Sequence, residues 1–96
     1  MELKEKITNR EATVAVIGLG YVGLPLAVEI AKVGFSVAGV DISPEKVKLV
    51  NDGRSDIRDV PDEVLSPLVM DGKLRATTEF SILKQADVIS ICVPSQ

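Results

Sequence analysis

Residues 14–23 constrain the fold of this chain more than any other stretch, because an apolar run there ends in three glycines with the spacing G-x-G-x-x-G. A buried strand that feeds such a turn and then a helix is the arrangement that holds the pyrophosphate of a dinucleotide. Gly18 lets the backbone turn sharply as it leaves the strand, Gly20 leaves room for a phosphate near the backbone, and Gly23 lets the following helix pack closely on the sheet. The spacing alone is weak evidence, so the surrounding elements have to support it.

The hydrophobic pattern of the chain alternates between strands and helices. Residues 13–17 are apolar on both sides of the pleat, which is typical of a parallel strand covered on both faces. The expected strands are 13–17, 35–40, 74–77 and 88–93, and the expected helices are 21–33, 44–53, 61–71 and 78–85. This alternation predicts an α/β protein with right-handed crossovers. We expect a partial Rossmann fold, whose parallel sheet has strand order 3-2-1-4 and helices on both faces.

Local signals set several helix boundaries. Ser43 is the expected N-cap of the second helix, and Pro44 occupies its first position. In the third helix, Pro67 either kinks the helix or restarts it. The last helix is expected to be capped by Thr77 or Thr78.

Two stretches carry no periodic pattern. Residues 1–12 form a polar lead-in, and residues 54–60 are expected to form a loop between the second and third helices. The charged residues of this loop alternate in sign and are expected to be a solvated surface: Arg54, Asp56, Arg58 and Asp59.

The composition is that of an ordinary globular domain. The 96 residues are 46% hydrophobic and 26% charged, which suits one domain with a core. The net charge is −3 and both signs are interspersed, so no nucleic-acid partner is expected. One cysteine and no histidine leave no internal disulfide and no cluster of metal ligands. The charged N-terminus and the lack of an apolar run of about 18 residues predict no membrane span, and a cytoplasmic location.

Asp41 supports a dinucleotide site, because it ends the second expected strand at the distance beyond Gly23 where such sites carry an acid. A carboxylate there accepts hydrogen bonds from the adenosine ribose hydroxyls and repels a 2′-phosphate. Ile42 follows it, rather than an arginine that would pair with such a phosphate. The expected cofactor is therefore NAD rather than NADP. The plainer alternative for Asp41 is an acid that faces solvent in a loop.

Other candidate residues have open alternatives. The backbone N–H groups of Tyr21 and Val22 are expected to contact the pyrophosphate, while the Tyr21 side chain packs over the turn. Lys46 either reaches the cofactor phosphate or ribose, or is a solvated lysine. Ser95 follows the fourth strand and either touches the nicotinamide half or has no role. Cys92 has no histidine to activate it and is expected to be a structural thiol.

Residues 16–27, with the sequence VIGLGYVGLPLA, resemble the opening of the nucleotide-sugar dehydrogenases, the UDP-glucose/GDP-mannose dehydrogenase family. The continuation Tyr-Val-Gly-Leu-Pro is far more specific than the glycines. Further matching positions are 41, 46, 51–53, 76–80, 86–88 and 92–95. The resemblance implies an NAD-binding domain, with Tyr21, Val22, Asp41, Lys46 and Ser95 at family cofactor positions. Serine at 95 replaces the usual threonine and keeps its hydroxyl, whereas glutamine at 96 replaces the usual proline.

The resemblance also implies a reaction for a longer parent enzyme. Members of the family oxidise the primary alcohol at C6 of a nucleotide-linked sugar to a carboxylate, with two hydride transfers to NAD and a thioester on a cysteine. That cysteine and its lysine and asparagine helpers belong to segments beyond residue 96. Residues 1–96 are therefore expected to be a truncated N-terminal NAD-binding domain that binds cofactor without catalysis. Residues 53–61 lack the Pro-x-x-Glu-Pro pattern of the glucose branch, which favours a UDP-N-acetylhexosamine as the substrate of the parent.

Two other functions remain compatible with a glycine turn. One is a regulatory Rossmann module that senses a nucleotide without chemistry. The other is a methyltransferase, whose glycines usually run G-x-G-x-G; valine at position 22, where that pattern has a glycine, argues against it. In a truncated domain the fifth and sixth strands are missing and the fourth expected strand becomes an apolar edge, so self-association of this chain is expected. The parent is expected to be a homo-oligomer.

Overall fold

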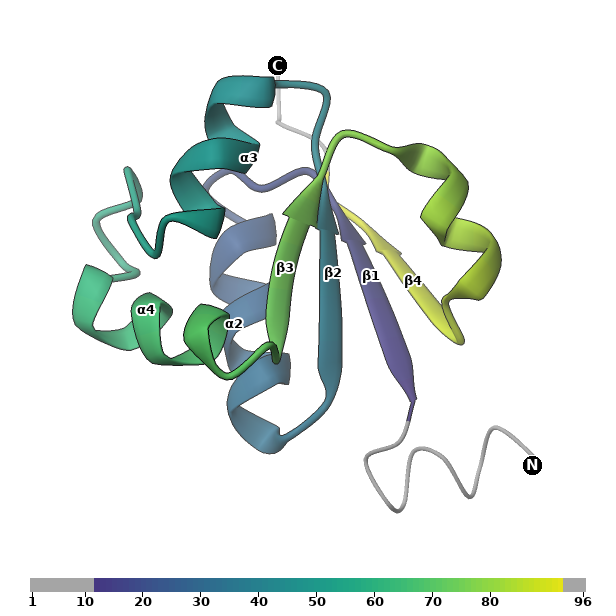
Figure 1. Cartoon of the computed structure of the whole chain (residues 1–96), viewed down its shortest axis with the longest axis horizontal. Coiled ribbons are helices and arrows are strands. Elements are labelled where there is room, and N and C mark those ends of the chain that lie inside the picture. The colour runs from purple at the N-terminus through teal and green to yellow at the C-terminus, as the bar shows by residue number, and fades with distance from the viewer. Residues whose placement is uncertain (1–11, 93–96) are drawn as a thin grey trace.

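The computed structural model describes residues 12–92 and is built on a four-stranded parallel sheet with the order β3-β2-β1-β4 (Figure 1). The strands are β1 (Thr13–Ile17), β2 (Ser36–Val40), β3 (Leu74–Thr77) and β4 (Val88–Ile91). The expected fold class and strand order are confirmed. Because every pair is parallel, the carboxyl ends of all strands meet at one end of the sheet, at the top of Figure 1.

β1 lies in the interior of the sheet, between β2 and β4. Ala15 and Val16 are completely buried, and each has a paired strand on both sides within the sheet. Ile17 pairs with Val40 of β2 and with Ile91 of β4, so the last residues of these strands lie in one row. The glycine turn leaves the sheet directly beyond that row.

The helices lie on both sides of the sheet. α2 (Gly23–Val33), α3 (Pro44–Asn51) and α4 (Asp62–Met70) cover one face, and the 3₁₀ helix η1 (Phe80–Gln85) lies on the other (Figure 1). α2 packs on β1 and β2 and also contacts α4, while α3 packs against β3. η1 has no buried residue, so it covers its face of the sheet only in part.

The hydrophobic core fills the space between the sheet and the three α-helices. It includes alternate strand residues such as Val14, Val16 and Leu74, because alternate side chains point to the same face of a strand. The largest fully buried side chains are Leu19, Leu24, Leu65, Leu74, Val16, Val40 and Val50. Burying each such leucine stabilises the fold by about 2 kcal/mol, so the turn residue Leu19 is also a core residue.

Two of the expected helices differ from the prediction. α4 continues through Pro67 and does not restart there. Because proline has no N–H, the Glu63 carbonyl loses its usual helical donor. Both residues are exposed, so water can satisfy this carbonyl. The last helix is a 3₁₀ helix that begins at Phe80, and no side chain caps it. Thr77 Oγ1 instead accepts a hydrogen bond from the Glu79 N–H at 3.0 Å, before the helix. Without a buried face, this segment lacks the packing that stabilises a regular α-helix.

At two other helix ends the capping residues are of the types that commonly stand there, whereas one helix begins later than expected. Ser43 caps α3, because its Oγ accepts a hydrogen bond from the Lys46 N–H at 3.2 Å, and Pro44 is the first helical residue. Gly34 ends α2 with φ 117°, a conformation that glycine adopts readily. α2 begins at Gly23 rather than at residue 21, so Tyr21 and Val22 belong to the turn.

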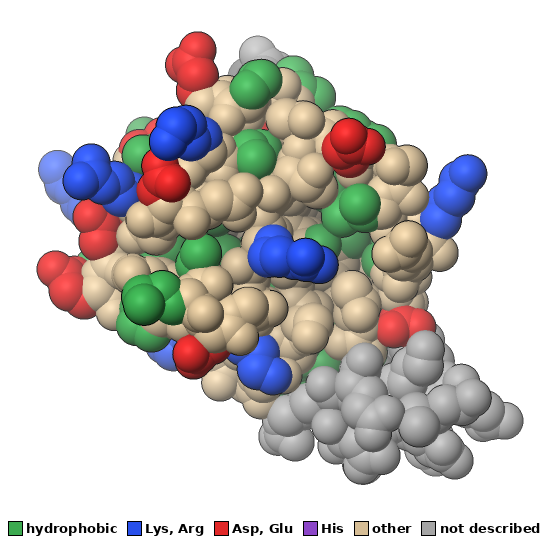
Figure 2. All heavy atoms as spheres, in the orientation of Figure 1, with side chains coloured by type: hydrophobic (Ala, Val, Ile, Leu, Met, Phe, Trp, Pro, Cys, Tyr) green, Lys and Arg blue, Asp and Glu red, His purple; other side chains and the backbone are tan. Residues whose placement is uncertain are grey.

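The surface is mixed in charge, except along β4. Figure 2 shows acidic and basic side chains interspersed on the visible face, with no continuous basic area. β4 exposes apolar side chains, with Ile91 67% and Ile89 46% exposed. Within residues 12–92, no helix has the length and apolar character needed to cross a membrane.

Candidate functional site

The first glycine of the turn, Gly18, is fixed by backbone from the ends of two neighbouring strands. Gly18 has φ +93°, and a Cβ on it would lie 2.0 Å from the carbonyl oxygen of Cys92, the residue that follows β4. Its N–H donates to the Val40 carbonyl oxygen at 2.7 Å. A side chain at position 18 would therefore meet backbone from β4 while also straining its own backbone.

The other two glycines of the motif have opposite surroundings. A Cβ on Gly23 would lie 1.5 Å from the carbonyl oxygen of Gly18, because the first turn of α2 packs directly against the end of β1. A Cβ on Gly20 would have nothing within 4 Å, and φ at Gly20 is not in the left-handed region. The turn is therefore closed on the side of Gly23 and open above Gly20.

The beginning of α2 offers free hydrogen-bond donors. Its N-cap residue is Val22, no side chain caps it, and its first turn contains no acid, whereas Glu45 lies in the first turn of α3 and Asp62 in that of α4. Among residues 12–92, no acceptor pairs with the backbone N–H groups of Gly20, Tyr21 and Val22. Free N–H groups and the positive end of a helix dipole together favour an anion.

The Asp41 carboxylate lies beside this turn and is fixed by two backbone donors. Oδ2 accepts from the Leu19 N–H and Oδ1 accepts from the Ser43 N–H, each at 2.9 Å. The side chain is half-buried, so Asp41 is not simply a solvent-facing acid. An ionised carboxylate accepts about four hydrogen bonds, which leaves capacity for two sugar hydroxyls.

Tyr21 and Lys46 lie differently from what the sequence suggests. The Tyr21 side chain is 81% exposed instead of packing over the turn. It lines a cavity of about 450 Å³ together with Asp56, Arg58 and Asp59 of the following loop. Lys46 is not a solvated lysine: its ammonium pairs with the Asp56 carboxylate, and its side chain is only 17% exposed. The four charged residues of the loop are exposed, as expected, and Asp56 also pairs with Lys46.

The sequence pattern of the UDP-glucose/GDP-mannose dehydrogenase family, NAD binding domain, matches residues 12–95. The chain belongs to this family. It is an NAD-binding domain, and the geometry suits that cofactor, because free N–H groups for a pyrophosphate lie next to a fixed carboxylate for a ribose.

Relatives support the same assignment. UDP-N-acetyl-D-mannosamine dehydrogenase of Pyrococcus horikoshii is 41% identical over 81 residues, which are 83% of this chain and 19% of that protein. GDP-mannose 6-dehydrogenase of Pseudomonas savastanoi pv. phaseolicola is 40% identical over 82 residues, again 83% of this chain and 19% of the other. A crystal structure of a ternary complex of GDP-mannose dehydrogenase from Pseudomonas aeruginosa matches with TM-score 0.81 and 35% identity, over 86% of this chain and 20% of that one. The chain spans about a fifth of the length of these relatives.

The remaining candidates are Ser95 and Cys92. Ser95 lies outside the described residues. Cys92 is half-buried and packs against the core of the NAD-binding domain, with its Sγ 3.9 Å from Ser90 Oγ. Residues 12–92 contain no group of three side chains that could hold a metal ion.

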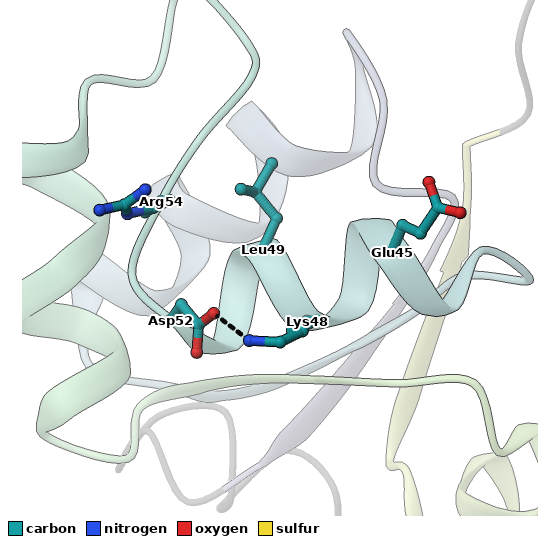
Figure 3. Close-up of a pocket in the computed structure, with 5 residues that line it drawn as sticks. All are labelled: Glu45, Lys48, Leu49, Asp52 and Arg54. Carbon is teal, nitrogen blue, oxygen red and sulfur yellow. Dashed lines mark hydrogen bonds and ion pairs between the residues drawn. The ribbon is translucent and has the colours of Figure 1, made fainter.

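A second hollow, of about 310 Å³, lies along α3 and contains none of the predicted cofactor residues. Figure 3 shows Lys48 and Asp52 pointing toward one another, and their ion pair measures 2.8 Å. Glu45, Leu49 and Arg54 complete the lining. Both members of the ion pair are more than half exposed, so it contributes about 0–1 kcal/mol and offers no fixed charge to a ligand.

The sequence patterns did not predict the structural roles of three residues: Leu19, Gly39 and Asp56. Leu19 donates its N–H to Asp41 and buries its side chain, which is 1% exposed. Gly39 in β2 makes room for it, because a Cβ there would lie 2.7 Å from Leu19 Cδ2. A glycine inside a strand is a signal of such close approach. Asp56 had no comparable signal, since an alternating charged loop does not indicate which acid pairs with Lys46.

Proposed function

We propose that this domain holds NAD for a nucleotide-sugar 6-dehydrogenase, with the cofactor pyrophosphate on the N–H groups of Tyr21 and Val22. The three free donors of the turn, in a helix start without acids, carry this proposal. Gly18, Gly20 and Gly23 shape the turn around the pyrophosphate. In this arrangement Asp41 accepts hydrogen bonds from the adenosine ribose, Lys46 lies at the same end, and Ser95 contacts the nicotinamide half.

The proposed parent reaction converts the C6 primary alcohol of a nucleotide sugar into a carboxylate. NAD would supply the hydride acceptor: overall, the alcohol and one water would give the carboxylate, two NADH and three protons, the protons passing to bases or solvent. The residues of this chain bind and orient the cofactor, and none of them is proposed as catalytic. The fragment alone is therefore expected to bind NAD without turnover.

A UDP-N-acetylhexosamine is the proposed sugar substrate. One feature of the sequence supports it: residues 53–61 lack the pattern of the glucose branch. The parent protein, assayed by NADH absorbance, should prefer UDP-N-acetylmannosamine or UDP-N-acetylglucosamine over UDP-glucose and GDP-mannose. A higher kcat/KM with GDP-mannose would contradict this choice and leave the NAD site unaffected.

We also propose a cytoplasmic homo-oligomer as the setting of the parent enzyme. The single cysteine fits a reducing compartment. Cell fractionation and light scattering of the purified parent test the two statements separately.

Calorimetry on the 96-residue chain tests the cofactor assignment. Titration with NAD should give saturable heat, whereas NADP and S-adenosylmethionine should give much weaker heat or none. Binding of S-adenosylmethionine alone would favour a methyltransferase, and binding of NADP alone would contradict the role of Asp41.

A further inference from the structure

The Lys46–Asp56 ion pair lies at the adenosine end of the candidate site. Lys46 is in the first turn of α3, and its backbone N–H donates to Ser43 Oγ at 3.2 Å. Ser43 in turn donates its own N–H to Asp41 Oδ1 at 2.9 Å. The base of the Lys46 side chain is therefore fixed near the Asp41 carboxylate, the proposed partner of the ribose. We call Asp41, Ser43, Lys46 and its partner Asp56 the ribose corner, or simply the corner.

The other member of the pair joins this corner to the glycine turn. Asp56 accepts from the Lys46 ammonium and also lines the cavity beside Tyr21. The Lys46 side chain is 17% exposed and the Asp56 side chain 52%, so the pair lies at the surface while most of the lysine side chain is covered. An ion pair that is partly shielded from water is stronger than one on the open surface.

The charge balance of this corner bears on the choice between NAD and NADP. The 2′-phosphate of NADP adds a charge of about −1.5 to −2 next to the ribose hydroxyls. Lys46 is linked to Asp41 through the Ser43 cap, and its ammonium is a cation that such a phosphate would attract. Because Asp56 already neutralises Lys46, the corner holds two carboxylates and one ammonium, with a net charge of −1.

We propose that Asp56 is a specificity-determining positioning residue, which holds the Lys46 ammonium away from a 2′-phosphate and so reinforces the preference for NAD. The inference rests on the proposed NAD site. It differs from the role of Asp41, because Asp41 repels the phosphate directly whereas Asp56 removes its potential partner.

The test measures the ratio of the dissociation constants for NADP and NAD in the complete 96-residue chain. Asp56→Asn should lower this ratio about tenfold at low ionic strength, because Lys46 becomes free to pair with the phosphate. Lys46→Met combined with Asp56→Asn should abolish the gain. Asp56→Glu, which can keep the ion pair, should retain the wild-type ratio.

Asp59→Asn is the charge-matched control, because Asp59 lines the same cavity but makes no ion pair with Lys46. It should change the ratio less than twofold. Equal effects of Asp56→Asn and Asp59→Asn would overturn the inference in favour of a general charge effect. An unchanged ratio in a folded Asp56→Asn chain that still binds NAD would also overturn it. If the wild-type chain does not bind NAD, the proposed function itself is rejected.

Discussion

The carboxylate of Asp41 accepts a hydrogen bond from the backbone N–H of Leu19 at 2.9 Å, although the two residues are 22 positions apart. This contact joins the end of β2 to the middle of the glycine turn. The residue expected to hold the ribose therefore also fixes the turn expected to hold the pyrophosphate. Binding and local stability are coupled through one side chain, which leads to the first prediction.

Asp41→Asn should both destabilise the chain and weaken NAD binding. An amide retains the shape of the carboxylate, but its NH₂ group must face either the Leu19 or the Ser43 N–H, so one donor loses its acceptor. The expected loss in the free energy of unfolding is about 1–3 kcal/mol, measured by urea denaturation. Glu29→Gln, at an exposed acid of α2 with a 3.7 Å ion pair, should change it by less than about 0.5 kcal/mol. Equal stability of the two variants would contradict the bridging role.

Two of the three glycines of the motif, Gly23 and Gly20, should separate folding from binding. Gly23→Ala forces a Cβ into the Gly18 carbonyl, so the free energy of unfolding should fall by about 3 kcal/mol or more. Gly20→Ala meets nothing within 4 Å, so the thermal midpoint should stay close to that of the wild type while NAD binding weakens. Thermal unfolding and calorimetry on the two variants check both effects. A Gly20→Ala chain that binds NAD normally would place the pyrophosphate elsewhere.

Asn51 should protect the outer edge of β3. Its Nδ2 donates to the Ala76 carbonyl and its Oδ1 accepts from the Ala76 N–H, each at 2.9 Å, which copies the pairing of a neighbouring strand. Asn51→Ala should cost about 1–2 kcal/mol and increase aggregation, because the backbone of an edge strand becomes available. Denaturant unfolding and size-exclusion chromatography measure the two effects. Asp52→Ala, at the adjacent surface position, should cost less than about 1 kcal/mol and leave the elution unchanged.

β4 should mediate self-association of the chain. Ile91 and Ile89 are 67% and 46% exposed on an edge strand, and no strand within residues 12–92 pairs with its outer side. Sedimentation velocity should therefore show dimers or larger species whose fraction rises with concentration. Ile91→Lys should shift the distribution toward monomer, whereas the same change at the exposed Met70 of α4 should not. A wild-type chain that remains monomeric at high concentration would rule this surface out.

Much of the fold was predictable because local signals and the hydrophobic pattern agree. The strand order, the Ser43 cap and the glycine at the end of α2 follow from residue types at defined positions. The helix type of η1 was not predictable, because it depends on how little of that segment the sheet buries. Sequence shows that Thr77 can cap a turn, but it does not show where the following helix begins.

The candidate site was predictable at the backbone level and less so at its side chains. The turn and the position of Asp41 depend on spacing along the chain, which the glycines and the end of β2 fix. The orientation of Tyr21 and the partner of Lys46 depend on where residues 54–60 lie in space. No pattern within that loop encodes its position, since its path is set by packing of Ile57 and Val60 into the core.

The contact of the Cys92 carbonyl with Gly18 has a mechanical consequence. The N–H of Cys92 also donates to the Ile17 carbonyl at 2.7 Å, so the last residue of β1, the first glycine and the exit from β4 are tied into one unit. A long ligand that reaches from the turn to the exit of β4 would lie on a surface whose two ends are joined by these backbone contacts. The sheet would then set how such a ligand is aligned between the glycine turn and the exit of β4.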